Sequence, residues 1–175
     1  MEKGSIQFQL DERKALEAML YILSKQPAVN IYNLVKAMFE ADKTHLNQHG
    51  RPVTGDVYFK MEHGTVPSAI YDMIKGNLFK LADLELEKYP FTIEGHDIKA
   101  SRAPDMGYLS KSDIAALDEG IKKYLHLPFG KVKEINHQEK CWLDGTMNAP
   151  ISFESMIENP KILDQLKKNG LKRVV

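Results

Sequence analysis

The sequence has almost no cysteine: Cys141 is the only one in 175 residues, so no disulfide can form within the chain. Lys and Arg together number 24, as do Asp and Glu, and the formal net charge is zero. This excludes a global field that would attract nucleic acid or an anionic membrane. The apolar runs are too short to span a bilayer, and no signal-peptide core is visible. We therefore expect a cytoplasmic protein without a membrane partner.

The motifs of common catalytic and cofactor sites are also missing. The chain has no serine nucleophile elbow, no cysteine-rich metal frame and no pair of carboxylates at a plausible catalytic spacing. Gly50, Gly55 and Gly64 lie in expected turns, but their spacing matches neither GxGxxG nor a Walker loop. We expect positive φ at Gly55 or Gly64. No enzyme activity, catalytic residue, bound metal or cofactor is predicted.

Helical periodicity is what the sequence does contain, in a composition that is 43% hydrophobic and 27% charged and that suits one domain. Asn30 and Gly50 bound the second expected helix, Thr65 caps the third with Pro67 in its first turn, and Ser110 opens the fifth. The first two helices are expected to pack as a helical hairpin. The expected helices cover residues 11–26, 31–49, 66–75, 78–88, 110–127 and 132–143, with two more near residue 152 and from 160 until Gly170.

Shorter segments predict a small β element. Residues 57–61 alternate apolar and polar side chains, which places Val57, Phe59 and Met61 on the one apolar face of a short strand. Residues 91–93 and 98–100 flank a four-residue loop and predict a β-hairpin. The expected fold class is therefore α+β and predominantly helical, a single domain of about seven helices with a small antiparallel β element.

Polar side chains interrupt the apolar stripe of the second expected helix. At about 100° per residue, Asp42, His45 and His49 fall on the same face as the apolar residues that begin with Ile31. A carboxylate that points into a core must have a partner, so we expect backbone N–H groups, a hydroxyl or the Arg51 cation to hold Asp42. The three polar side chains could instead bind zinc or iron, although the HExxH motif is absent.

Two further alternatives concern possible reactive or partner-binding side chains. His137 and Glu139 near Cys141 suggest a thiol nucleophile with a base, but neighbours on one helix rarely meet in that geometry, and an inert thiol is favoured. Trp142 and Tyr58 are of the types that anchor protein partners, although a lone Trp is more often part of a core.

A series of spaced residues forms a pattern across the chain: Lys36, Phe39, Asp42, His45-Leu46, Gly50-Arg51-Pro52-Val53-Thr54-Gly55, Tyr58, His63-Gly64, Val66-Pro67, and much later Ile135, His137 and Trp142. This pattern resembles the SocA-like antitoxin domain, also called the Panacea domain, of phage-associated GepA-type proteins. The resemblance runs from residue 16 to residue 157 within the single domain expected for residues 1–175, and it is strongest between Lys36 and Tyr71. It departs at Thr65, where the family usually has proline after the glycine.

The resemblance implies a mostly helical antitoxin of a type II toxin–antitoxin system. Such a protein neutralises a toxin encoded by an adjacent gene through direct protein binding. The resemblance brings no catalytic or metal-binding residue, and exposed partner contacts are expected from Arg51, Tyr58 and Tyr71 near the motif. It implies structural roles for Asp42, His45, Gly50, Arg51, Gly55, Gly64, Pro67, His137 and Trp142.

Two other classes of protein remain as alternatives. The helical hairpin followed by a helix and a strand could form a winged-helix-like DNA-binding regulator of transcription, although no basic recognition helix supports it. A metal-dependent or thiol hydrolase is the minor alternative, and a stoichiometric metal ion in the purified protein would favour it.

Overall fold

The computed structural model describes residues 5–172, and the side chains of residues 5–169. Over this range the chain is predominantly helical with small antiparallel sheets, so the predicted α+β class is confirmed. It forms nine α-helices where about seven were expected. The α-helices are α1 Glu12–Leu23, α2 Ile31–His49, α3 Ser68–Ile74, α4 Leu78–Asp83, α5 Lys111–Tyr124, α6 Phe129–Asn136, α7 Lys140–Leu143, α8 Phe153–Met156 and α9 Pro160–Lys172, and Met106–Tyr108 forms a 3-10 helix, η1.

The strands form two separate antiparallel sheets. A three-stranded sheet has the order β1-β5-β4, and a two-stranded sheet pairs β2 with β3. Consequently the short segment between α1 and α2 pairs with a strand from the middle of the chain. The strands are β1 Val29–Asn30, β2 Tyr58–Met61, β3 Gly64–Pro67, β4 Phe91–Glu94 and β5 Asp97–Ala100.

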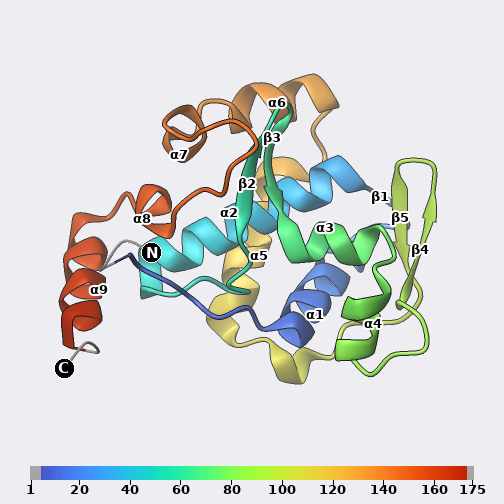
Figure 1. Cartoon of the computed structure of the whole chain (residues 1–175). Coiled ribbons are helices and arrows are strands. Elements are labelled where there is room, and N and C mark those ends of the chain that lie inside the picture. The colour runs from blue at the N-terminus through green and yellow to red at the C-terminus, as the bar shows by residue number, and fades with distance from the viewer. Residues whose placement is uncertain (1–4, 173–175) are drawn as a thin grey trace.

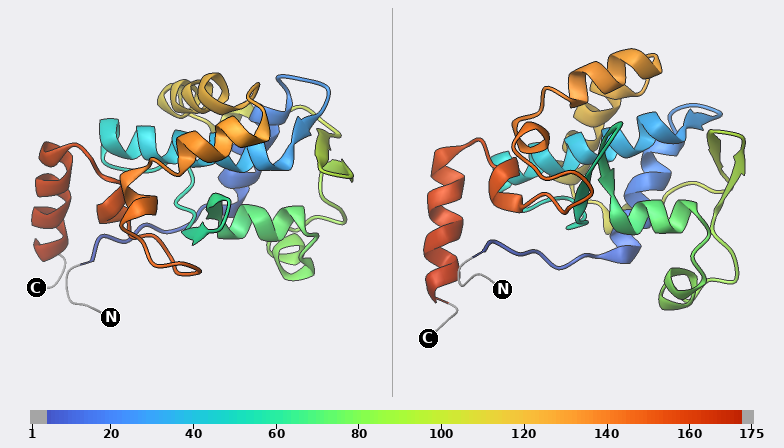
Figure 2. Two further views of the ribbon diagram at one scale, coloured as in Figure 1. Left: turned by 90° about the horizontal axis from the view of Figure 1, so that it is seen from above. Right: turned by 45° about the horizontal axis from the view of Figure 1, so that its top comes forward.

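Helix α2 lies in the middle of the molecule, and α9 and the β4–β5 hairpin lie at opposite ends (Figures 1 and 2). Helix α2 packs against α1, as in the expected helical hairpin, but its most extensive contact is with α5. At the α2–α5 crossing a Cβ on Gly120 would lie 2.2 Å from the Ala37 carbonyl oxygen. Glycine is therefore required there, since only a residue without a side chain permits this approach.

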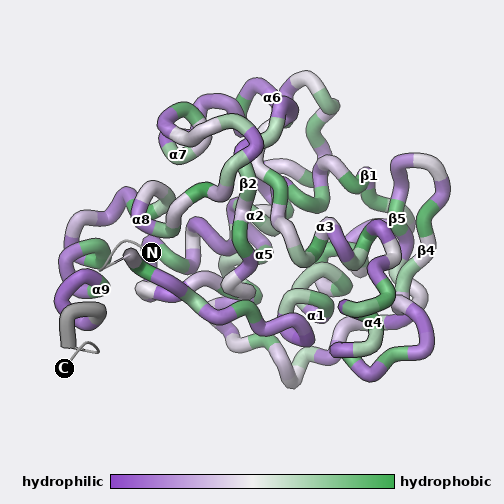
Figure 3. Tube along the Cα trace, viewed as in Figure 1, coloured by the Kyte–Doolittle hydropathy of each residue, from purple (hydrophilic) through white to green (hydrophobic). Residues whose placement is uncertain are grey.

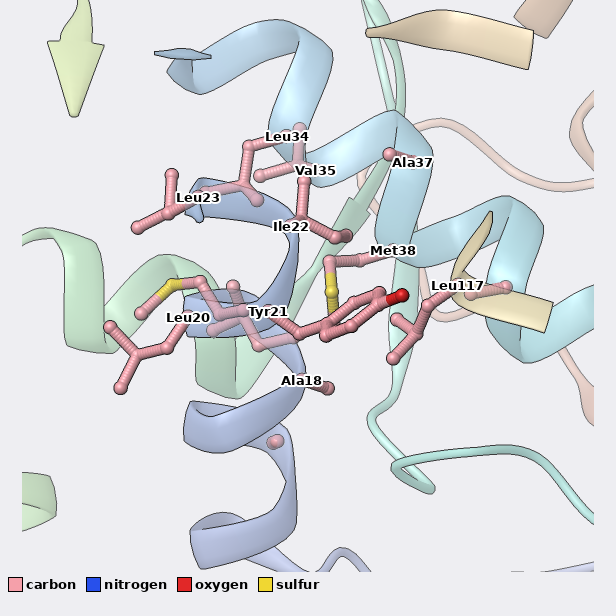
Figure 4. Close-up of a cluster of buried hydrophobic side chains, with 14 of the residues drawn as sticks. Ala18, Leu20, Tyr21, Ile22, Leu23, Leu34, Val35, Ala37, Met38 and Leu117 are labelled. Carbon is pink, nitrogen blue, oxygen red and sulfur yellow. The ribbon is translucent and has the colours of Figure 1, made fainter. Parts of the chain in front are cut away.

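The hydrophobic core has two clusters, and α2 contributes side chains to both. The larger cluster joins α1, α2 and α5, and Figure 4 shows Leu20, Met38 and Leu117 among its side chains. The smaller one includes Phe39, and the amphipathic helix α9, whose hydrophobic and hydrophilic residues alternate in Figure 3, covers part of it. Among the described helices, none combines the length and apolarity that crossing a membrane requires.

Local capping chemistry sets the ends of several helices as predicted. The Asn30 side chain accepts the Tyr32 N–H at the start of α2, and Gly50 ends that helix with φ of 72°. Ser110 and Asp113 form a capping box at the start of α5. These ends depend on residues within one turn of each other, which is why the sequence identified them.

Some helix ends differ from the predictions. Helix α1 ends at Leu23, three residues before residue 26, and α4 ends at Asp83, where the expected helix continued to 88. The segment expected to be one helix over 132–143 is two, because the helical bonding stops between α6 and α7. Helix α9 continues through Gly170, since glycine weakens a helix without necessarily ending it.

The β2–β3 region corrects three further predictions. Thr65 lies within β3 and does not cap α3. The Asp56 carboxylate instead accepts two N–H groups from the first turn of that helix, those of Ala69 and Ile70. Pro67 was expected in the first turn of α3. It is instead the last residue of β3 and lies immediately before that helix. In the other hairpin the strands extend to a two-residue loop, shorter than the predicted four.

The buried face of β2 is opposite to the predicted one. Tyr58 is buried, whereas Val57 and Met61 are exposed and Phe59 is half-buried. The reason is a tertiary contact: the Tyr58 ring packs edge-on against Phe39, and its hydroxyl has an acceptor inside the protein. An amphipathic ring with a satisfied hydroxyl thus takes the interior position that periodicity alone assigned to its neighbours.

Candidate functional site

The Asp42 carboxylate is the centre of a completely buried polar cluster. The Thr54 N–H donates to Oδ1 at 2.8 Å, the Thr54 hydroxyl donates to Oδ2 at 2.6 Å, and the Tyr58 hydroxyl donates to Oδ2 at 2.7 Å. The partners are therefore a backbone N–H and two hydroxyls, and not Arg51. Burial raises the pKa of Asp42 to about 6, against the opposing effect of these hydrogen bonds. The cluster ties α2 to the loop that follows it and to β2.

Arg51 pairs with a residue that the sequence did not connect to it. Its guanidinium contacts Asp113 at 3.1 Å, and the Lys14 ammonium contacts the other oxygen of the same carboxylate at 2.8 Å. Burial by itself would raise the pKa of Asp113, but hydrogen bonds from Lys14 and Ser110 outweigh it and lower this pKa to about 2. One carboxylate thus joins α1, the loop after α2 and the start of α5.

The two histidines of the predicted polar face have different surroundings. His45 is buried, and its Nδ1 and Nε2 atoms lie 2.7 Å from the Arg51 carbonyl oxygen and 2.9 Å from the Ser112 hydroxyl. Desolvation lowers its pKa. His49 is exposed, which corrects the prediction of a buried face, because α2 emerges from the core before this last turn. Since both ring nitrogens of His45 have protein partners, these side chains do not present a ready metal site.

The described residues also contain no group of three His, Cys, Asp or Glu side chains arranged to hold a metal ion. The thiol alternative meets a separate obstacle, because Cys141 is buried and burial raises its pKa to about 12. A thiol with that pKa is not a thiolate at neutral pH.

Gly64 begins β3 at a place where α2 and α6 side chains approach the strand closely. Its φ is 111°, and Gly55 also has positive φ, 79°, which confirms the prediction for these turns. The Asn136 amide oxygen accepts the Thr65 N–H at 2.7 Å, and the Lys36 ammonium donates to the Thr65 carbonyl oxygen at 2.6 Å. Side chains from α2 and α6 therefore satisfy the backbone on the outer edge of β3.

His137 and Trp142 stack on one another beside the β2–β3 hairpin. Their ring centres are 3.9 Å apart with an interplanar angle of 11°. The Trp142 indole N–H donates to the Met61 carbonyl oxygen at 3.1 Å, and the Lys60 ammonium lies 4.3 Å from the Trp142 ring centre. This pair fastens the α6–α7 segment to β2, so motif residues far apart in sequence surround one hairpin.

The three residues expected to contact a partner differ in their exposure. Tyr58 was expected to be exposed, and this is wrong, because it is 1% exposed and bound to Asp42. The Arg51 side chain is 44% exposed, but its guanidinium is engaged with Asp113. Tyr71 is 36% exposed and lines a surface cavity, with the Lys75 ammonium 4.4 Å from its ring centre, so it is the exposed aromatic ring of the three.

The cavity beside Tyr71 has a volume of about 1090 Å³ and lies among the start of α2, the β2–β3 hairpin, α3 and the β4–β5 hairpin (Figure 1). The sequence pattern marks Lys36 only as a motif position and gives no indication of the cavity. Helical periodicity placed Lys36 off the apolar stripe, but residues 33–39 of this central helix are all buried. Phe129 and Ile93 also line the cavity, and no local sequence signal connects these two residues.

Residues 34–143, more than half of the chain, match the family model described as "Antitoxin SocA-like, Panacea domain". The framework around α2 and the β2–β3 hairpin is thus that of an antitoxin-like domain. The chain belongs to the SocA-like antitoxin family, the Panacea domain family. No curated protein and no solved structure matches the chain significantly.

Proposed function

We propose that this protein is the antitoxin of a type II toxin–antitoxin pair. Acting in the cytoplasm as one domain over residues 1–175, it binds the toxin encoded by an adjacent gene and blocks it without chemistry of its own. The observation that carries the proposal is membership of the SocA-like antitoxin family over residues 34–143. Type II antitoxins are proteins that act by contact, so the proposal requires a stable complex of two chains.

The internal contacts of the motif support a framework role. Asp42, His45 and Arg51 each have partners inside the protein, and Trp142 is held by a backbone carbonyl. Groups used in this way hold elements together and are not free to act on a substrate. Together with Gly50, Gly55, Gly64 and Pro67 they shape the loop after α2 and the hairpin, which positions neighbouring surfaces for a partner.

Growth rescue tests the proposal, provided that both genes are expressed from unrelated inducible promoters. The adjacent gene alone should stop growth, and co-expression of this chain should restore it while the two proteins co-purify. Because neither gene then has its natural promoter, transcriptional repression cannot produce the rescue. Rescue without a complex, or a neighbour that is not toxic, would contradict the proposal.

Stoichiometry separates binding from catalysis. If the antitoxin acts by occupancy, toxin activity in vitro should fall in proportion to added antitoxin and reach its minimum near one equivalent. The toxin recovered from the complex should keep its original mass. Inhibition by a small fraction of an equivalent, or a changed mass, would instead favour an enzyme. Gly120→Val is a suitable inactive control, because its Cβ would lie 2.2 Å from the Ala37 carbonyl oxygen and disrupt the α2–α5 crossing.

A further inference from the structure

The cavity beside α3 has the size and composition of a site for a protein segment. Its volume, about 1090 Å³, lies at the upper limit of the roughly 300–1,000 Å³ that drug-sized ligands occupy. Met61, Tyr71, Ile93 and Phe129 line it, and all four are exposed to solvent. Methionine and aromatic residues are enriched at protein interfaces, whereas isolated exposed apolar residues are ordinary. Here they converge on one concave surface.

A buried cation lies on the lining of this cavity. The side chain of Lys36 is completely buried, its ammonium donates to the Thr65 carbonyl oxygen, and it lies 4.5 Å from the Tyr32 ring centre. No ion pair within the described residues includes it. Desolvation lowers its pKa to about 7. A buried ammonium without a carboxylate is costly, and an incoming carboxylate would remove that cost.

Two carboxylates also line the cavity, and neither compensates this charge. Glu62 is exposed at the turn of the β2–β3 hairpin, and Asp72 is on α3. Glu62 is exposed and Asp72 is half-buried, so Lys36 is the charged side chain that this lining buries. A buried cation beside an apolar wall complements an apolar segment with a negative charge.

We propose that this cavity receives one peptide segment of the toxin, which places apolar side chains against Tyr71 and Phe129 and one Asp or Glu carboxylate beside Lys36. The inference rests on the proposed function, because the segment belongs to the protein that the antitoxin neutralises. It names the surface, which family membership does not. The Tyr71 and Phe129 rings supply apolar contact area, and Lys36 selects for the charge.

A matched pair of tyrosines tests the surface. Tyr71 is 36% exposed with the Lys75 ammonium over its ring, and Tyr108, outside the cavity lining, is 42% exposed with the Arg13 guanidinium over its ring. In the full-length chain, Tyr71→Ser should weaken binding of the purified toxin by about tenfold or more, and Tyr108→Ser should leave it nearly unchanged. Isothermal titration calorimetry measures both, and thermal unfolding verifies that both variants are folded.

The charge is tested with overlapping synthetic peptides that cover the toxin sequence. One peptide should bind the full antitoxin, and replacing its Asp or Glu by Asn or Gln should weaken binding by about tenfold. With Lys36→Met the acidic and amide peptides should bind equally, because the cation that distinguishes them is gone. Lys25→Met, which removes an exposed ammonium that lies over the Tyr21 ring, is the control and should preserve the difference.

The outcomes separate this inference from the proposed function. The inference would be overturned if Tyr71→Ser bound the toxin as tightly as wild type. It would also be overturned if Lys36→Met and wild type showed the same difference in affinity between the acidic and amide peptides. Either result would leave the antitoxin role standing. Self-association that Tyr71→Ser abolishes while toxin binding persists would also overturn it, since the occupant would be a second copy. Failure of the toxin to bind wild type at all would overturn both.

Discussion

Gly64 and Asn136 are in contact so close that a Cβ on Gly64 would lie 2.1 Å from the Asn136 amide oxygen. That oxygen accepts the Thr65 N–H at 2.7 Å, and the amide nitrogen donates to the Thr65 hydroxyl at 3.1 Å. The glycine thus allows the last residue of α6 to bond with the edge of β3. The contact explains why glycine follows His63 in the motif.

Gly64→Ala should destabilise the protein by about 2–4 kcal/mol, because it combines positive φ with a collision in the core. The new Cβ would also lie 2.9 Å from the Lys36 Cε atom. Urea unfolding measures the loss. Gly95→Ala is the control, since φ there is 63° and nothing lies within 4 Å of the added atom. It should cost only about 1–2 kcal/mol, for its left-handed backbone. Equal losses in the two variants would contradict the argument from contact.

Asp42→Ala should lower the free energy of unfolding by about 2–4 kcal/mol. The substitution leaves the Thr54 N–H, the Thr54 hydroxyl and the Tyr58 hydroxyl without their buried acceptor. Differential scanning calorimetry at neutral pH would show the loss as a lower Tm. Asp83→Ala, at an exposed carboxylate, should leave the Tm nearly unchanged. A shift for Asp42→Ala as small as that of the control would show that the cluster contributes little.

Stability should also depend on pH through Asp42. Its pKa is raised from 3.8 to about 6 in the folded protein, so the fold binds this proton more tightly than the unfolded chain does. The resulting stabilisation is complete below the unfolded pKa and is lost as the pH rises through about 6. Relative to Asp42→Asn, which cannot titrate, wild type should lose about 2 kcal/mol between about pH 4 and about pH 7. Parallel stability curves for the two proteins would contradict the raised pKa.

DNA binding by the isolated chain should be weak and nonspecific. With 24 basic and 24 acidic residues, few phosphates can be neutralised without repulsion elsewhere, so counterion release contributes little affinity. Fluorescence anisotropy at physiological salt should show no tight complex with DNA from upstream of the gene. DNA of scrambled sequence should bind equally weakly. Nanomolar binding that depends on sequence would instead support a regulator of transcription.

Helix boundaries were predictable where the chemistry is local. Asn30 and Gly50 bound α2, and the Ser110–Asp113 capping box opens α5, because each signal acts within about one helical turn. The need for a partner at Asp42 was also predictable from its place on the apolar stripe. Which partner it takes was not, since backbone N–H groups, a hydroxyl and the Arg51 cation were all acceptable on chemical grounds.

The sequence by itself therefore determined the helical class, the main helix ends and the positive φ of Gly55 and Gly64. Only the tertiary structure decided that Arg51 pairs with Asp113, 62 residues away, and that Thr65 bonds to Asn136, 71 residues away, with Gly64 against the same side chain. Tertiary packing also placed the Tyr58 side chain in the core. Periodicity specifies that a face is apolar but not which element covers it, and partners so distant in sequence are selected by packing of the whole chain.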